Sequence, residues 1–175
     1  QLAHAAQDAS VRPGFEVFRA MLYYLDAFPE RQHHPKEDEH LFARLRARAP
    51  QAAALLDDLH AEHLKGAKLI RDLEQALLAF EQGWPDGADV FAAVVDEYAR
   101  FQRAHMRKEE REAIPLAEKA LSSEDWDAIE QAFAANTDPF SHPQYHTDFS
   151  KLYSRIVELA PDPIGLGAPW KKTGA

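Results

Sequence analysis

Two distant segments of the chain carry the same pair of potentially metal-binding residues. His33 is followed four residues later by Glu37, and His105 is followed four residues later by Glu109. Residues four apart lie on the same face of an α-helix, one turn from each other. Imidazole nitrogens and carboxylate oxygens that converge from several helices suit iron or manganese. The spacing therefore predicts a dinuclear metal site in the core of a helical bundle.

A third histidine motif lies between these two segments. His60 and His63 are three residues apart, and His63 falls on the apolar stripe of its helix, directly after Glu62. A single histidine on an apolar face is more often a core residue than a ligand. The neighbouring histidine–glutamate motifs nevertheless favour a ligand role for His63. For His60, ligation, support of a ligand and simple exposure all stay open.

Pro35 leaves a second register open for the first motif. It lies between His33 and Glu37 and contributes no backbone N–H to a helix. His34 and Asp38 have the same four-residue spacing on a face rotated by one residue. We rank His33 and Glu37 first, and His34 and Asp38 replace them if the helix has a different phase.

The elements that must position these residues have a helical hydrophobic pattern. Apolar residues recur every three or four positions within residues 15–28, 51–82 and 88–121, and shorter helices are predicted at 122–135 and 144–159. Near Pro29, a helix either restarts or bends and then continues to Ala49. Residues 1–8 resemble the end of a helix whose beginning is missing, and no strand is predicted.

These elements predict an all-α fold, an up-down four-helix bundle with a short extra helix and a C-terminal extension. We expect the bundle to span residues 1–138, with an apparently truncated first helix. The extension then spans 139–175 and ends in a tail rich in proline and glycine.

The composition argues against several functional classes. The chain contains no cysteine, which removes disulfides, iron–sulfur clusters, Cys-ligated zinc and a cysteine nucleophile. Its formal net charge of -9 is a poor match for nucleic acid or an anionic membrane surface. No apolar run approaches the roughly 20 residues of a membrane span. We expect neither nucleic acid nor membrane as a partner, and we expect a cytoplasmic protein.

Together, the three motifs resemble the signature segments of the hemerythrin-like, HHE cation-binding family. The family pattern H-x-x-x-E is followed by an apolar pair and often by proline. Leu41-Phe42 and Pro115 fall at the matching offsets from His33 and His105, and Glu62-His63 resembles the third-helix EH motif. The resemblance extends from about residue 15 to 138, and its register is the reason for ranking His33 above His34.

The resemblance implies a four-helix bundle around a non-haem di-iron centre. The two irons of the family are typically bridged by two carboxylates and an oxo or hydroxo group. Carried over to this chain, the pattern makes imidazole ligands of His33, His63 and His105 and bridging ligands of Glu37 and Glu109.

The family usually has a further histidine early in its first helix, and this sequence departs from that pattern. The expected position lies upstream of Gln1, and His4 matches it poorly. His60 is therefore a candidate to compensate for that ligand.

We predict a metal-binding protein, assign no catalytic residue and leave enzymatic activity open. The expected cofactor is iron, with other divalent metals as alternatives. The expected partner is a small diatomic ligand, O2 or NO, which the centre binds or senses. Alternatively, the protein handles the redox state of iron. Two alternatives stay open: an iron donor for the repair of iron–sulfur centres, and a helical interaction module without catalytic metal. A homodimer is also left open.

Overall fold

The fold is built around three long helical rods. A computed structural model describes residues 1–134 and 146–173. The first rod consists, without a break, of α2 (Phe15–Leu25), η1 (Asp26–His33), α3 (His34–Lys36), η2 (Glu37–Phe42) and α4 (Ala43–Arg48). After the 3-10 turn η3 (Pro50–Ala52), the second rod is α5 (Ala53–Glu81). The third rod joins α6 (Gly87–Lys108), η4 (Glu109–Ala113) and α7 (Ile114–Ala120).

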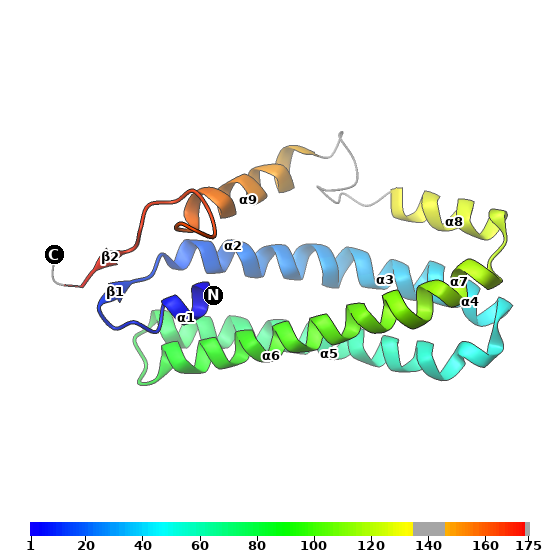
Figure 1. The fold of residues 1–175 in the computed structure, drawn as a ribbon, viewed down its shortest axis with the longest axis horizontal. Coiled ribbons are helices and arrows are strands. Elements are labelled where there is room, and N and C mark those ends of the chain that lie inside the picture. The colour runs from blue at the N-terminus through cyan, green and yellow to red at the C-terminus, as the bar shows by residue number, and fades with distance from the viewer. Residues whose placement is uncertain (135–145, 174–175) are drawn as a thin grey trace.

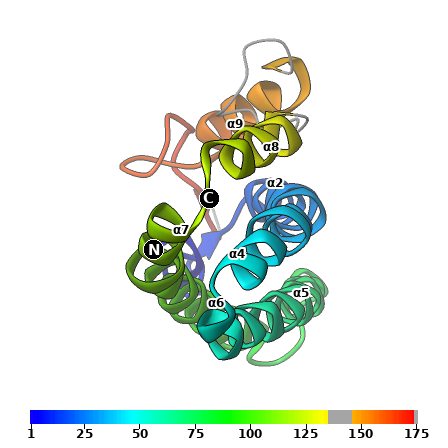
Figure 2. The same ribbon diagram turned by 90° about the vertical axis from the view of Figure 1, so that its right-hand side faces the viewer.

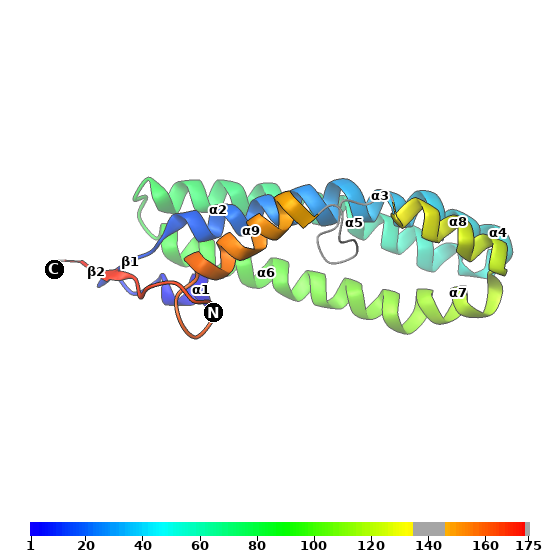
Figure 3. The ribbon, with the colours of Figure 1, turned by 90° about the horizontal axis from the view of Figure 1, so that it is seen from above.

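The rods run up and down beside one another, as predicted for an all-α hemerythrin-like bundle (Figure 1). α8 (Ser123–Ala134) and α9 (His146–Leu159) follow one another along the outer side of the first rod (Figures 1 and 3). The end-on view in Figure 2 places both on the same side of the three rods. α1 (Leu2–Ala5) is a short helix against α6. No helix in the described ranges has the length and apolar character needed to cross a membrane.

The C-terminal part returns to the start of the bundle, which the sequence did not predict. β1 (Val11–Arg12) pairs antiparallel with β2 (Lys171–Lys172), so the expectation of no strand was wrong. Strands of two residues are too short to show a hydrophobic alternation. Trp170 packs against Phe18 of α2, with ring centroids 5.9 Å apart. The predicted boundary at 138/139 and the predicted helix start at 144 lie outside the described residues.

π-helical turns occur where proline interrupts the long rods. The first rod bends rather than restarts, with π-helical stretches over η1 and η2 that lie on either side of Pro35, and η1 contains Pro29. A third stretch, η4, directly precedes the helical turn that contains Pro115. Proline leaves the carbonyl four residues earlier without its usual donor, and a wider turn absorbs that defect. Of the two predicted histidine–glutamate motifs, His33, Glu37 and Glu109 lie in these stretches, and His105 lies in the last turn of α6.

Two apolar cores lie on either side of a polar layer. The first core joins buried residues of α1, α2, α5 and α6, among them Leu22, Ile70 and Phe91. The second joins η2, α4, α5, α7 and α8, among them Leu45 and Leu59. Between them, each rod contributes buried polar side chains: His34 and Glu37 from the first, His63 from the second and His105 from the third.

Replacing Leu56 with alanine should destabilise the bundle by about 2 to 5 kcal/mol, because its fully buried side chain would leave a cavity in the second core. Urea denaturation followed by circular dichroism measures this loss. Leu64→Ala on the same helix is the matched control, since Leu64 is 63% exposed. Equal losses in the two variants would contradict the assigned core.

Candidate metal centre

The five residues ranked first as metal ligands form one continuous chain of donor atoms. His33 Nε2 lies 3.4 Å from Glu37 Oε1, and the other oxygen of Glu37 lies 3.5 Å from His63 Nε2. Glu109 Oε1 is 3.8 Å from His63 Nε2 and 3.2 Å from His105 Nε2. All three rods therefore deliver nitrogen or oxygen donors to one place, while the ligand role of each residue stays a prediction.

Several of these donor atoms are buried without a hydrogen-bond partner. They are Glu37 Oε2, His63 Nε2, His105 Nε2 and Glu109 Oε1. Leaving buried polar atoms unpaired costs free energy, so such atoms call for a water or an ion. A cation among them would satisfy nitrogen and carboxylate donors at once. The donor set therefore fits a transition-metal ion of the kind that the sequence predicts.

The structure also places His34 inside the cluster. His34, His63 and His105 each have a nitrogen within 4.8 Å of those of the other two, and Glu37, His63 and Glu109 form a second such group. The ring of His34 stacks on that of His63, with centroids 4.3 Å apart. Of the alternative pair His34 and Asp38, the histidine therefore lies among the convergent donors.

His33, which the sequence ranked above His34, lies at the edge of the cluster. Its side chain is 39% exposed, and its ring meets Phe133 of α8 edge-on, with centroids 5.6 Å apart. Both adjacent histidines reach the cluster, because π-helical turns precede and follow this motif in the first rod. These wider turns change which residues face the cluster.

Carboxylates lie behind two of the central histidines. Glu62 Oε2 accepts a hydrogen bond from His105 Nδ1 at 2.9 Å, and Asp38 Oδ1 lies 3.1 Å from His63 Nδ1. A carboxylate on Nδ1 fixes the tautomer and ring orientation and leaves Nε2 for a metal. The other oxygen of Asp38 meets the exposed His60 at 3.0 Å. Asp38 and His60, both considered as ligands from the sequence, thus lie behind His63 rather than among the convergent donors.

Opposing effects set the protonation of the histidines in the absence of metal. Burial disfavours the imidazolium form of His105, but the neighbouring carboxylates of Glu109 and Glu62 outweigh it and raise its pKa to about 9. Burial also opposes charge on His63, and Glu109 and Asp38 raise its pKa. Burial favours the neutral form of Glu109, but contacts with His105 and His63 lower its pKa. Without a bound ion, these pKa directions favour imidazolium–carboxylate pairs at His105, His63 and Glu109.

Metal uptake should release protons, because a ligating imidazole is neutral and His105 carries a raised pKa of about 9 without metal. Because the histidine pKa is raised, protons compete with the metal for the imidazole nitrogen up to a higher pH. The apparent affinity for Co2+ should therefore increase from pH 6 to about pH 9 and then level off. Calorimetric titrations in buffers of different ionisation enthalpy measure the released protons. An affinity that is constant over this range, without proton release, would contradict the ligand role of His105.

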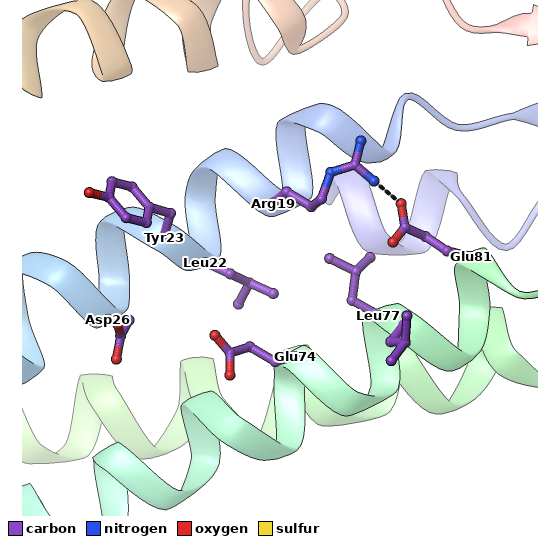
Figure 4. A pocket seen from close by; sticks show the side chains of 8 residues that line it. Arg19, Leu22, Tyr23, Asp26, Glu74, Leu77 and Glu81 are labelled. Carbon is purple, nitrogen blue, oxygen red and sulfur yellow. Dashed lines mark hydrogen bonds and ion pairs between the residues drawn. The ribbon is translucent and has the colours of Figure 1, made fainter. Parts of the chain in front are cut away.

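The tyrosines divide into one near the cluster and one remote from it. Tyr98 is buried, and burial together with the charge of Glu30 raises its pKa. Tyr23 is 61% exposed and lines a surface pocket between α2 and α5, where Arg19 pairs with Glu81 (Figure 4). That pocket contains no histidine. Tyr98 therefore lies within the influence of Glu30, which faces His34, whereas Tyr23 faces the surface pocket.

Sequence reasoning missed Glu30 and the partner of Glu62. The side chain of Glu30 is 5% exposed and faces His34, four residues later, from the preceding helical turn. A search for carboxylates before as well as after each histidine would have found this spacing. The partner of Glu62 is Lys108 of α6, which lies far from it in the sequence. His4 contacts Gln7 and Asp96 and belongs to neither group of convergent donors.

Replacing Glu62 with glutamine should lower metal affinity by about 10- to 100-fold, because His105 would lose the carboxylate that orients it. Competition of the variant with a chromophoric chelator for Co2+ gives this ratio. Glu110→Gln, at an exposed position next to the cluster, is the control. Equal affinities in the two variants would show that Glu62 has no orienting role.

The fold and the donor set assign the protein to the class of helical bundles with potential metal ligands in the core. A comparison with known families places the chain within that class: the hemerythrin HHE cation binding domain matches residues 1–117. The chain belongs to this hemerythrin family. The match ends within α7, so α8 and α9 lie beyond it. Neither a curated protein nor a solved structure matches the chain.

Proposed function

We propose that this protein binds two iron ions in the cluster of His33, Glu37, His63, His105 and Glu109, and that it uses them to bind or sense O2 or NO. Membership of a cation-binding family supports the metal. The observation that carries the proposal is the unbroken chain of five donors, most of them buried. The carboxylates of Glu37 and Glu109, each of which lies between two histidines, support two ions rather than one.

The residues of the cluster have different roles in this proposal. Glu37 and Glu109 lie between the histidines, and a carboxylate with two oxygens can contact two ions. Asp38 and Glu62 orient the imidazoles of His63 and His105 from behind. The apolar cores on both sides limit access of water. When bound, iron would supply a reversible redox change and an open coordination position for a small ligand.

A second function, donation of iron to other proteins, is favoured by the exposed edge of the cluster. His33 is 39% exposed, whereas His105 is 2% exposed, so one end of the donor chain is open to solvent and the other is closed. An ion that leaves through the His33 edge need not disrupt either core. Transfer of iron to an apo iron–sulfur protein, in competition with a chelator, tests this alternative directly.

Elemental analysis and visible absorption should find about two irons per chain, with charge-transfer bands that appear when the reduced protein is exposed to air. The reduced protein is prepared anaerobically, and spectra are then taken with air and, separately, with NO. Absence of metal from a folded, chelator-insensitive protein would favour the interaction module. Iron that produces no spectral change with either gas would exclude the ligand-binding role.

His105→Ala and Glu109→Ala should each lower the metal content sharply, since each removes a buried donor of the cluster. His40→Ala is the matched control, because His40 lies on the first rod outside both groups of donors. Metal content is measured on proteins purified identically, with circular dichroism as a check of folding. Equal metal content in the three variants would remove the site assignment.

A further inference from the structure

His34 has the same surroundings as the two histidines at the centre of the proposed site. It is 5% exposed, and its ring stacks on His63 with an interplanar angle of 6°. The ring of His105 meets it edge-on, with centroids 5.6 Å apart. One of its nitrogens lies within 4.8 Å of nitrogens of both other histidines.

His34 also has a carboxylate behind it, as His63 and His105 do. Its Nδ1 lies 3.4 Å from Glu30 Oε2 without a hydrogen bond, whereas Asp38 and Glu62 face the other two Nδ1 atoms at 3.1 and 2.9 Å. Three buried imidazoles, each with Nδ1 toward a carboxylate, form the arrangement in which metal-bound histidines are oriented. A histidine that only fills space in a core does not require a buried anion.

The chain accommodates the Glu30 carboxylate at a cost. Its side chain is 5% exposed, and Oε1 has no hydrogen-bond partner. A Cβ atom on Gly66 of α5 would lie 3.0 Å from that oxygen, so glycine leaves the space that the carboxylate occupies. Glycine inside a helix is unfavourable relative to alanine. If Glu30 positions a metal ligand, that role explains both the buried carboxylate of Glu30 and the glycine at position 66 that makes room for it.

We propose that His34 is a further metal ligand of this centre and that Glu30 is the residue that positions it. This inference rests on the proposed metal-binding function. The inference departs from the family pattern, which assigns the ligand role at this motif to His33. With His34 added, the first rod supplies two adjacent imidazoles, one at the exposed edge and one inside.

The test uses Co2+ bound to the 175-residue chain. The N–H proton of an imidazole bound to Co2+ gives an exchangeable, strongly shifted NMR resonance. His34→Gln should lose one such resonance and lower Co2+ affinity by at least about tenfold. The control His40→Gln should retain all resonances and the affinity of the unmodified protein.

Two further variants test the positioning role without removing the imidazole. Glu30→Gln should keep the His34 resonance, shift it, and lower affinity by about 10- to 100-fold. The control is Glu39→Gln at an exposed position of the same rod. Gly66→Ala should also lower affinity, because its Cβ displaces Glu30, although alanine favours the helix. In a Glu30→Ala background, Gly66→Ala should have no further effect.

The outcomes separate this inference from the proposed function. If His105→Ala binds Co2+ as tightly as the unmodified protein, the metal site is wrong and both proposals are overturned. If His105→Ala loses binding while His34→Gln and Glu30→Gln retain affinity and every shifted resonance, only the role of His34 and Glu30 is overturned. Circular dichroism identifies any variant that fails to fold, and the Glu30 and Gly66 variants then decide the question.

Discussion

Glu37 and Glu109 bring carboxylates into an interior whose buried side chains are mostly those of leucine, alanine and phenylalanine. An ionised group in such surroundings is tolerated only if opposite charge or hydrogen bonds compensate it. Without metal, raised histidine pKa values supply that positive charge, so imidazolium and carboxylate stabilise each other. In the proposed function, a bound cation would take the place of these protons. The same cluster is thus compatible with a folded bundle in both states, because each state balances the buried negative charge.

The apolar cores hold the donors at fixed positions along all three rods. On α5, Leu59 belongs to one core, Ile70 to the other, and His63 lies between them. The other rods repeat this order around His34 and His105, so the polar residues form a layer across the bundle. Packing on both sides of the layer resists rotation of any one rod. The donor atoms can therefore converge without a disulfide or a covalent link, which a chain without cysteine cannot form.

The helical class of the fold could be predicted from the sequence, and so could the convergence of the main candidate residues, because both depend on spacing along single helices. His105 with Glu109 and the apolar stripe around His63 follow simple helical periodicity, and the structure brings these residues together. The pair of strands near the termini could not be predicted, because a two-residue strand has no pattern of its own. The orienting role of Asp38 depends on a contact with α5, which no local spacing reveals.

The choice between His33 and His34 shows the physical limit of such reasoning most clearly. A helix with regular turns would present only one of two adjacent residues to the centre. Here π-helical turns on both sides of the motif change the rotation per residue, and both rings reach the cluster. Proline creates this irregularity, because a missing N–H at Pro29 or Pro35 favours a wider turn. The feature that made the sequence ambiguous is therefore the one that lets the first rod contribute an inner and an outer imidazole, which gives the cluster one closed end and one end near solvent.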